Sequence, residues 1–345
     1  MALSKEYVVN TLRPTEERIK KLAFAFREAK LVLSAVELEL FTVLAEGPLA
    51  LEDLRDRIGV NTRGARDFFD ALVAVGLLQR NQNEVYANSP DSDLYLDRRK
   101  DTYIGGELDH ANTQLYGRWV SLTAGLRTGQ PQTGAGTAGN YPTFYSNPVS
   151  LDAFLRAMTG ATLLPAKALV AKFSWRDYAT VIDIGCAQGC LPVLIAQAHG
   201  HITGGGFDLP EVKPAFEDYV RKHHLENRLQ FHGGDFFQVP LPSADVLVMG
   251  RVLHNWDLAQ KKMLLRKAYE ALPKGGALVV YERMIDDERR SNASGLLSSL
   301  NMLVMTSGGF DYTASDCIGW MREVGFRHIG RDVLTPEQYM VTGSK

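Results

Sequence analysis

The sequence predicts a protein of two parts, a helical winged-helix domain followed by an α/β domain built on a doubly wound, mostly parallel sheet. Apolar residues in the first hundred positions recur at three- and four-residue steps, which is typical of helices with one buried face. From residue 179 onward, apolar strand-like runs alternate with helical segments, which favours a parallel sheet. The length of 345 residues fits two domains better than one core.

Composition and charge exclude several classes of protein. Apolar residues make up 45% and charged residues 23%, the balance of a globular protein in water. A formal net charge of −2 gives no overall attraction for nucleic acid or for an anionic membrane. No apolar run approaches the length of about 18 residues that spans a bilayer, and the charged N-terminal segment lacks the apolar core of a secretory signal. The cysteines Cys186, Cys190 and Cys317 do not form a disulfide framework, so we expect a cytoplasmic protein.

The first hundred residues predict a winged helix. One amphipathic pattern runs over 24–44, a second covers 51–58, and a third covers 63–78. A short polar turn at 80–84 then separates two apolar pairs, as in a β-hairpin. Three helices closed by a small hairpin form a winged helix-turn-helix.

A winged helix can bind DNA, and the charge of this one argues against that function. Residues 51–100 hold eight Lys/Arg and nine Asp/Glu, a net charge of −1. On the candidate recognition helix, Asp67 and Asp70 stand beside Arg63 and Arg66. Because a surface that faces phosphates is basic, the sequence favours a packing or dimerisation module.

A glycine-rich segment separates the two halves. Residues 128–140 are rich in Gly, Thr and Gln, a composition typical of a flexible connection or of a lid over a pocket. Helical patterning returns at 150–158 and continues to about residue 173. This stretch therefore predicts a connection followed by one long helix.

The remaining chain predicts an alternating sheet of seven strands. The strands of the parallel part are expected at 180–184, 201–207, 229–231, 244–249 and 277–281. Helices are expected at 191–198, 212–223, 260–271 and 315–324. Two last strands, at 328–333 and 339–342, are expected to finish the sheet as an antiparallel hairpin.

Acids and glycines follow the first three strands of this sheet. Asp183, Gly185 and Gly189 form a turn in which the backbone can approach a ligand and a helix N-terminus offers free N–H groups. Asp208 ends the second strand, where an acid can accept both hydroxyls of a ribose. Asp235 ends the third strand and precedes an aromatic residue, a pair suited to an adenine. The alternative, that these acids are only helix caps, is the poorer account, because ligands of open α/β sheets bind at the carboxyl ends of the strands.

Four motifs together carry a specific resemblance. The sequence resembles the plant phenolic and hydroxyindole O-methyltransferase family, which includes bacterial natural-product enzymes, through Asp183-Ile-Gly185-Cys-Ala-Gln-Gly189, Phe207-Asp208-Leu209-Pro210, Gly234-Asp235-Phe236-Phe237 and Arg251-Val-Leu-His254-Asn-Trp256. The resemblance covers nearly the whole chain. It implies a Rossmann-like class I methyltransferase domain with a seven-stranded, mostly parallel sheet, preceded by an all-α winged-helix dimerisation domain that forms a homodimer.

The resemblance also implies S-adenosylmethionine as the cofactor and assigns residues to it. Gly185 would lie beneath the methionine part, Asp208 would hold the ribose, and Asp235 with Phe236 would hold the adenine. The full set of expected cofactor residues is Tyr145, Asp183, Gly185, Asp208, Leu209, Gly234, Asp235, Phe236, Arg251 and Trp256.

By the same resemblance His254 is the general base. Imidazole titrates near neutrality, which suits proton removal from a phenol whose pKa is about 10. Glu282 and Asp311 match the family acids that flank this histidine, although Asp311 falls where many members carry a glutamate. Ala187 replaces a frequent glycine of the cofactor loop, and Gly250 stands where plant members often carry a lysine.

The acceptor is expected to be a small aromatic compound, of the phenolic class, from specialised metabolism. Met and aromatic side chains suit a flat substrate, and the expected lining residues are Phe154, Met158, Asn301, Met302 and Met305. The expected domains are 1–105 (dimerisation), 106–175 (helical linker and substrate pocket) and 176–345 (cofactor binding). We expect no metal, nucleic acid or membrane as a partner.

Three alternatives remain open at this point. Deprotonation of a phenol also activates its ring carbons, so the same base could serve carbon methylation. A second alternative is a ligand-sensing winged-helix regulator with a degenerate methyltransferase domain, although His254 and Asp208 are both present. A nicotinamide-dependent dehydrogenase would suit the sheet, but the glycine spacing differs from the dinucleotide fingerprint.

Overall fold

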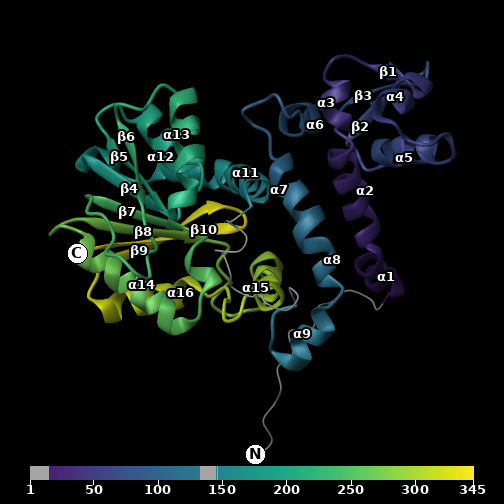
Figure 1. Ribbon diagram of the computed structural model, residues 1–345. Helices are drawn as coiled ribbons and strands as arrows, with labels where there is room; N and C mark the ends of the chain where they lie inside the picture. Colours follow the sequence, from purple (N-terminus) through teal and green to yellow (C-terminus); the bar gives the residue numbers. More distant parts are fainter. Residues whose placement is uncertain (1–14, 133–144, 146) are drawn as a thin grey trace, which may run out of the picture. The chain divides into compact units, whose positions relative to one another are not determined.

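The computed structural model describes residues 15–132, 145 and 147–345 and divides the chain into two compact units (Figure 1). The first unit is Met1–Asp97 and the second is Arg98–Lys345. Most of the glycine-rich segment, whose interpretation as a connection or lid was left open, lies outside the described residues.

The first unit is a small helical domain with a three-stranded sheet. Its helices are α1 (Glu16–Phe24), α2 (Phe26–Glu37), α3 (Leu40–Leu44), α4 (Leu51–Ile58), α5 (Thr62–Ala74) and α6 (Pro90–Tyr95). Its strands are β1 (Leu49–Ala50), β2 (Leu78–Arg80) and β3 (Val85–Asn88), in the antiparallel order β1-β3-β2. The expected hairpin is β2–β3, and β1 adds a strand that the sequence did not predict.

The amphipathic pattern at 24–44 is broken in the structure. It covers the end of α1, all of α2 and α3, with a break where Glu39 adopts a left-handed conformation (φ 53°). The pattern reports which residues face the core, including Leu33, Val36 and Leu40. Periodicity alone does not show where the helix axis changes direction.

Most of the arginines between residue 51 and the end of the first unit form ion pairs with acids of the same unit. Asp70 of α5 accepts hydrogen bonds from Arg80 (2.6 Å) and from the hydroxyl of Tyr86 (2.7 Å), which ties this helix to the hairpin. Arg66 of the same helix pairs with Glu84 at 3.0 Å. The candidate recognition helix thus directs two of its charged side chains into the domain's own hairpin.

The second unit is an α/β domain. Its helices are α7 (Gly105–His110), α8 (Tyr116–Trp119), α9 (Leu122–Thr128), α11 (Pro148–Lys172), α12 (Cys190–Ala198), α13 (Lys213–Lys222), α14 (Leu258–Ala271), α15 (Ala293–Met305) and α16 (Ala314–Val324). A π-helical segment, η1 (Ala111–Leu115), joins α7 to α8, and short 3₁₀ turns occur at η2 (Trp175–Asp177), η3 (Pro210–Val212) and η4 (Leu253–Asn255).

Seven strands form the sheet of this unit. They are β4 (Thr180–Ile184), β5 (Thr203–Asp208), β6 (Leu229–Gly233), β7 (Val246–Gly250), β8 (Ala277–Glu282), β9 (Arg327–Thr335) and β10 (Gln338–Ser344). Their order is β6-β5-β4-β7-β8-β10-β9. The first five are parallel, and β10 joins antiparallel to both β8 and β9. Each predicted strand is present, with ends displaced by at most two residues.

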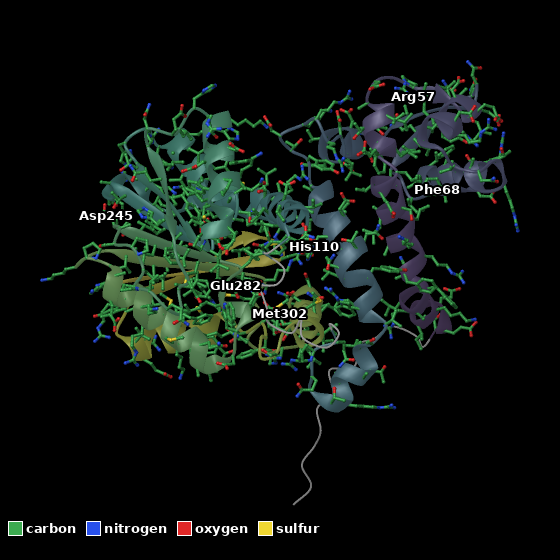
Figure 2. All side chains as sticks on the ribbon, in the orientation of Figure 1. Arg57, Phe68, His110, Asp245, Glu282 and Met302 are labelled. Carbon is green, nitrogen blue, oxygen red and sulfur yellow. The ribbon has the colours of Figure 1, made fainter. Side chains whose placement is uncertain are left out.

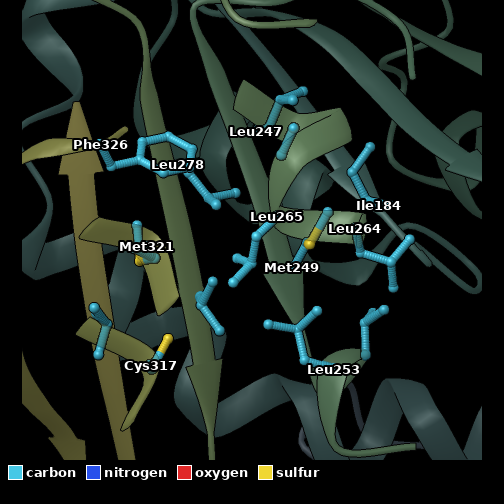
Figure 3. Packing of buried hydrophobic residues seen from close by; sticks show 14 of the residues in the cluster. Ile184, Leu247, Met249, Leu253, Leu264, Leu265, Leu278, Cys317, Met321 and Phe326 are labelled. Carbon is cyan, nitrogen blue, oxygen red and sulfur yellow. The ribbon is translucent and has the colours of Figure 1, made fainter. Parts of the chain in front are cut away.

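Helices cover both faces of the sheet, as Figure 1 shows for α12 and α13 on one side and α14 and α16 on the other. Alternate strand residues serve the two faces. Ile184, Leu247 and Met249 pack against Leu264 and Leu265 of α14, together with residues of α16 (Figure 3). Val181, Val246 and Val248 pack on the opposite face with residues of α11 and α12. Burial on both faces explains why these strands read as continuous apolar runs.

The parallel strands bring five chain turns to one edge of the sheet. The carboxyl ends of parallel strands lie on the same side, so the residues that follow β4, β5, β6, β7 and β8 meet there. Among the described residues, no helix has the length and hydrophobicity needed to cross a bilayer.

Candidate active site

A large cavity opens at this edge of the sheet, entirely within the second unit. Its volume is about 1410 Å³, which exceeds the range of roughly 300–1,000 Å³ typical of a site for one drug-sized ligand. The cavity is lined by every residue expected to bind cofactor or acceptor, namely Tyr145, Asp183, Gly185, Asp208, Leu209, Gly234, Asp235, Phe236, Arg251, Trp256, Phe154, Met158, Asn301, Met302 and Met305. His254 also lines it. The cavity therefore has room for two ligands side by side.

The turn after β4 forms the floor of one half of the cavity. Gly185 has φ 75°, and a Cβ at this position would lie 2.8 Å from a methyl group of Val252, so only glycine fits. The Gly185 N–H donates to the carbonyl of Phe207 on β5 (2.8 Å). Ala187 adopts a left-handed conformation (φ 48°), which glycine would adopt with less strain.

Asp208 and Asp235 each hold a turn and line the cavity. Asp208 accepts from the N–H of Ala187 (3.0 Å) and from that of Leu209 (2.8 Å). Burial raises the pKa of Asp208 to about 6, although both backbone hydrogen bonds oppose the shift. Asp235 accepts from the N–H of Phe237 (2.8 Å). Neither acid caps a helix among the described residues, since Leu209 is the N-cap of η3 and the next element after Asp235 is β7. Their hydrogen bonds hold turns, and both side chains line the cavity.

An aromatic corner lies beside Asp235. Trp256 meets Phe237 edge to face, with ring centroids 4.6 Å apart, and meets Phe236 at 5.7 Å. Lys267 of α14 donates to the carbonyls of Phe236 and Val239, the latter at 2.8 Å, which fixes the loop after β6. The corner is a rigid apolar wall suited to a flat ring.

Arg251 follows β7 in a strained conformation. Its φ is 58°, and its N–H donates to the carbonyl of Tyr281 (3.0 Å). Its Nη1 is buried and has no hydrogen-bond partner among the described residues. The preceding residue is Gly250, where a Cβ would lie 2.1 Å from the ring of Tyr281. The close ring explains the absence of a larger side chain at position 250.

His254 lies in the 3₁₀ turn η4, directly after this segment. Its Nδ1 contacts Asp311 Oδ1 at 3.2 Å, and its backbone N–H donates to Glu282 Oε1 at 3.1 Å. Burial disfavours the charged imidazolium, but the neighbouring charges of Asp311 and Glu282 outweigh burial and raise the pKa of His254 above its ordinary value. The three predicted catalytic residues therefore come together, with His254 at the cavity and both acids behind it.

Separate elements hold the two acids in place. Glu282 is the last residue of β8, and its Cα is paired with that of Tyr339 on β10. Asp311 lies between α15 and α16, where its N–H donates to the hydroxyl of Ser299 (3.2 Å). Both carboxylates are 1% exposed, and burial raises the pKa of Glu282. Figure 2 labels Glu282 within this unit.

Lys261 is a buried cation that the sequence interpretation missed. It lies on α14, is fully buried, donates to the carbonyl of Trp256, and places Nζ 3.5 Å from the centroid of the Phe310 ring. Burial lowers the pKa of Lys261 to about 8, while Glu282 and Asp311 act in the opposite direction. Its position three residues before Leu264 places it on the apolar face of α14, and this spacing could have indicated a buried lysine.

The three predicted catalytic residues, His254, Glu282 and Asp311, are also close enough together to hold a metal ion and are called the catalytic trio. One ligand atom each from His254, Glu282 and Asp311 lies within 4.8 Å of the others, close enough to surround a metal ion. A cation at this place would compete with the contact between Nδ1 and Asp311. Removal of metals by a chelator separates the two arrangements.

The other half of the cavity is lined by the continuous helix of α7, η1 and α8, and by α15. Trp119 of α8 donates from Nε1 to Asn301 Oδ1 of α15 (2.9 Å), which joins the two walls. Figure 2 labels His110 on α7 and Met302 on α15. His110 meets Phe154 edge to face at 5.8 Å. The sequence interpretation named the α15 residues, but it named neither His110 nor Trp119.

Comparison with known proteins decides the family. A model of the O-methyltransferase domain matches residues 119–327, and a model of the O-methyltransferase dimerisation domain matches residues 20–98. The chain belongs to the O-methyltransferase family. The prediction of the family and of its two-part fold is confirmed, and the protein is an S-adenosylmethionine-dependent methyltransferase.

Three relatives illustrate the range of this family. The tetracenomycin polyketide synthesis 8-O-methyl transferase TcmO of Streptomyces glaucescens is 41% identical over 327 residues, which cover 95% of this chain and 96% of that one. The N,N-dimethyltransferase OxyT of Streptomyces rimosus is 37% identical over 310 residues, 89% of each chain. The crystal structure of human N-acetylserotonin methyltransferase in complex with S-adenosylmethionine superposes with a TM-score of 0.89 at 25% identity, over 97% of this chain and 99% of that one.

The residues present in the cavity of this O-methyltransferase fit S-adenosylmethionine. The buried Nη1 of Arg251, which has no hydrogen-bond partner among the described residues, can donate to the ligand. Asp208 and Asp235 offer carboxylate oxygens to hydroxyl and amino groups, and the aromatic corner offers a flat wall. One half of the cavity thus matches the polar and aromatic parts of this cofactor.

Proposed function

We propose that this methyltransferase methylates a phenolic oxygen of a small, multi-ring aromatic acceptor of specialised metabolism, with His254 as general base. The observation that carries the proposal is the contact of His254 Nδ1 with Asp311 Oδ1 at 3.2 Å, on the wall of a cavity with room for two ligands. A base needs an orienting partner, and a buried carboxylate fulfils that role. Glu282 holds the backbone of the same 3₁₀ turn, because its Oε1 accepts a hydrogen bond from the N–H of His254.

The contact with Asp311 decides which nitrogen is the base. Because a carboxylate only accepts hydrogen bonds, the proton of neutral His254 lies on Nδ1 and the lone pair on Nε2. Nε2 takes the phenol proton, and the two carboxylates stabilise the imidazolium that forms. The raised pKa of His254 also lies closer to the pKa of a phenol, which is about 10, and this smaller difference in pKa favours proton transfer.

The cofactor half is assigned residue by residue. We propose that Asp208 binds the ribose, that Asp235, Phe236 and Trp256 bind the adenine, and that Arg251 lies along the cofactor. The backbone of Gly185 would lie beneath its methionine part, and Tyr145, Asp183, Leu209 and Gly234 would complete the contacts. When bound, S-adenosylmethionine supplies a methyl group activated by the positive charge on sulfur. The chain's own part is to align the acceptor oxygen with that methyl group.

The apolar lining supports an aromatic acceptor. Phe154, Met158, Met302 and Met305 offer flat or adaptable contacts, and Asn301 offers one polar group. The name of TcmO refers to polyketide synthesis, and its alignment covers 95% of this chain and 96% of TcmO. A multi-ring phenol is therefore the acceptor class that we propose.

Carbon methylation remains a second candidate, because the phenolate formed by His254 is also nucleophilic at its ring carbons. The comparison adds a third, nitrogen methylation, which the sequence interpretation did not consider, since OxyT is named an N,N-dimethyltransferase. The position of a ¹³C-labelled methyl group in the NMR spectrum of the product distinguishes oxygen, carbon and nitrogen. A methyl signal on carbon or nitrogen would overturn the proposed oxygen transfer.

Further assignments accompany the function. We propose a homodimer formed through the first unit, supported by the dimerisation-domain match at residues 20–98. Light scattering of the purified protein tests it, and a monomer at micromolar concentration would contradict it. The domain limits 1–105, 106–175 and 176–345 and a cytoplasmic location are also proposals. The three cysteines, all unpaired and buried, support the location.

Turnover with a panel of multi-ring phenols tests the acceptor class. The expected result is methyl transfer by the wild type and a loss of about 10²–10⁴-fold in His254→Ala, with unchanged affinity for S-adenosylhomocysteine. Transfer to none of the phenols by a protein that binds the cofactor product would contradict the acceptor class.

A further inference from the structure

Arg118 is a cation in the acceptor half of the cavity. It lies on α8, is half-buried and lines the cavity. Its Nη1 contacts Met305 Sδ at 3.6 Å, and a thioether is a weak acceptor. Among the residues that the structure describes, no carboxylate forms an ion pair or hydrogen bond with this guanidinium. Burial lowers the pKa of Arg118, and no nearby acid acts against the shift.

The neighbours of Arg118 do not neutralise it. His110 lies on the same helix, and burial, together with the charges of Arg251 and Arg118, lowers the pKa of His110 to about 4. This histidine is therefore uncharged at neutral pH. Two acids line the acceptor half among the described residues, Glu107 and Glu337, and both pair with Arg283, at 3.4 and 3.5 Å. Within the described part of the chain, Arg118 is thus the positive charge on this wall for which no counter-ion is found.

The surroundings strengthen any interaction that Arg118 makes. Leu115, Trp119, Met302 and Met305 form apolar walls near it in the cavity, and charge interactions are stronger where water is displaced. The hydrogen bond between Trp119 and Asn301 fixes α8 against α15. The π-helical segment η1 directly precedes α8, and such segments occur frequently at functional sites.

We infer that Arg118 binds a carboxylate of the methyl acceptor, so that the acceptor is an aromatic acid that carries a phenolic hydroxyl. A planar guanidinium matches a carboxylate with two parallel hydrogen bonds. The apolar walls then hold the rings, and His254 meets the hydroxyl. This inference rests on the proposed function, and it adds the charged group by which the acceptor is selected.

A matched pair of probes tests the inference. Protein saturated with S-adenosylhomocysteine is titrated calorimetrically with 3-hydroxy-2-naphthoate and with 2-naphthol, which differ in the carboxylate alone. Hydrogen bonds to charged groups contribute enough for a preference of about ten- to a hundredfold for the acid. We expect this preference in the wild type, a collapse of the ratio in Arg118→Met, and partial retention in Arg118→Lys.

The control is Arg127→Met on α9, where the arginine is exposed and does not line the cavity. This variant keeps the wild-type ratio. The affinity for S-adenosylhomocysteine in each variant reports whether the second unit is folded. Equal binding of both probes by the wild type, or an unaltered ratio in Arg118→Met, would overturn the inference and leave the proposed function intact. Failure of both probes to bind would instead count against the aromatic acceptor itself, and against this inference with it.

Discussion

Replacement of Asp311 by asparagine isolates the charge that governs His254. The contact between Nδ1 and Oδ1 is 3.2 Å, and Asp311 is 1% exposed, so solvent screens the pair little. Asparagine keeps an acceptor oxygen and nearly the same volume while removing the negative charge. The variant therefore changes electrostatics more than shape.

The sign of the expected shift follows from the charges. In the wild type, Asp311 and Glu282 outweigh the effect of burial and raise the pKa of His254. Without the charge of Asp311 that pKa falls, so His254 is deprotonated at lower pH. The rising limb of the pH–rate profile then moves to lower pH. The plateau falls as well, because a charge-assisted hydrogen bond of about 1.5–3 kcal/mol is lost from the imidazolium, or roughly ten- to a hundredfold in rate.

The assay is single-turnover methyl transfer to 2-naphthol from pH 5 to pH 10, with cofactor saturating. Asp311→Glu, which restores the carboxylate, is expected to return the limb towards the wild-type position. Asp332→Asn, on the exposed side of β9, is the matched control and keeps the wild-type profile. A rising limb in Asp311→Asn that stays in place or moves to higher pH would refute the proposed role of this carboxylate.

Three further predictions concern the cofactor half and the metal alternative. Because the pKa of Asp208 is about 6, the affinity for S-adenosylhomocysteine should weaken as the pH falls below 6. Asp208→Asn should bind this ligand at least tenfold more weakly, with an affinity that changes little between pH 5 and 7. If the affinity of the variant still depends on pH, another group causes the pH dependence. Ala187→Gly removes a left-handed alanine (φ 48°) and should raise the melting temperature by about 2–3 °C in scanning calorimetry, whereas a lower melting temperature would show that the turn is not strained. Treatment with EDTA should leave turnover unchanged, and an activity that is lost and then restored by a divalent cation would favour a metal at the catalytic trio.

Much of the site was predictable because its residues follow strands. Asp183, Asp208, Asp235 and His254 each come at or just after the end of a strand that the sequence pattern identifies. Parallel topology then brings them to one edge without any knowledge of side-chain packing. The Asp311 prediction rested on family resemblance, and the structure explains its place through the hydrogen bond to Ser299.

The remaining features depend on tertiary structure. Lys261 is fully buried because Trp256 and Phe310 surround it, although lysine is rarely buried and sequence patterns treat it as exposed. Arg118 faces a cavity because α8 packs against α15, a helix that the strand–helix alternation did not predict. The break at Glu39 is a local backbone conformation that no periodicity reports.

The most direct test of the central claim is a rapid-quench measurement of methyl transfer in preformed ternary complexes of the wild type and His254→Ala. Calorimetry first confirms that both proteins bind the cofactor product and 2-naphthol with similar affinity. If His254 removes the acceptor proton, the variant transfers the methyl group about 10²–10⁴-fold more slowly at pH 8, with the difference shrinking as the pH approaches the pKa of the phenol. Equal transfer rates in the two proteins would contradict the assignment of His254 as the base.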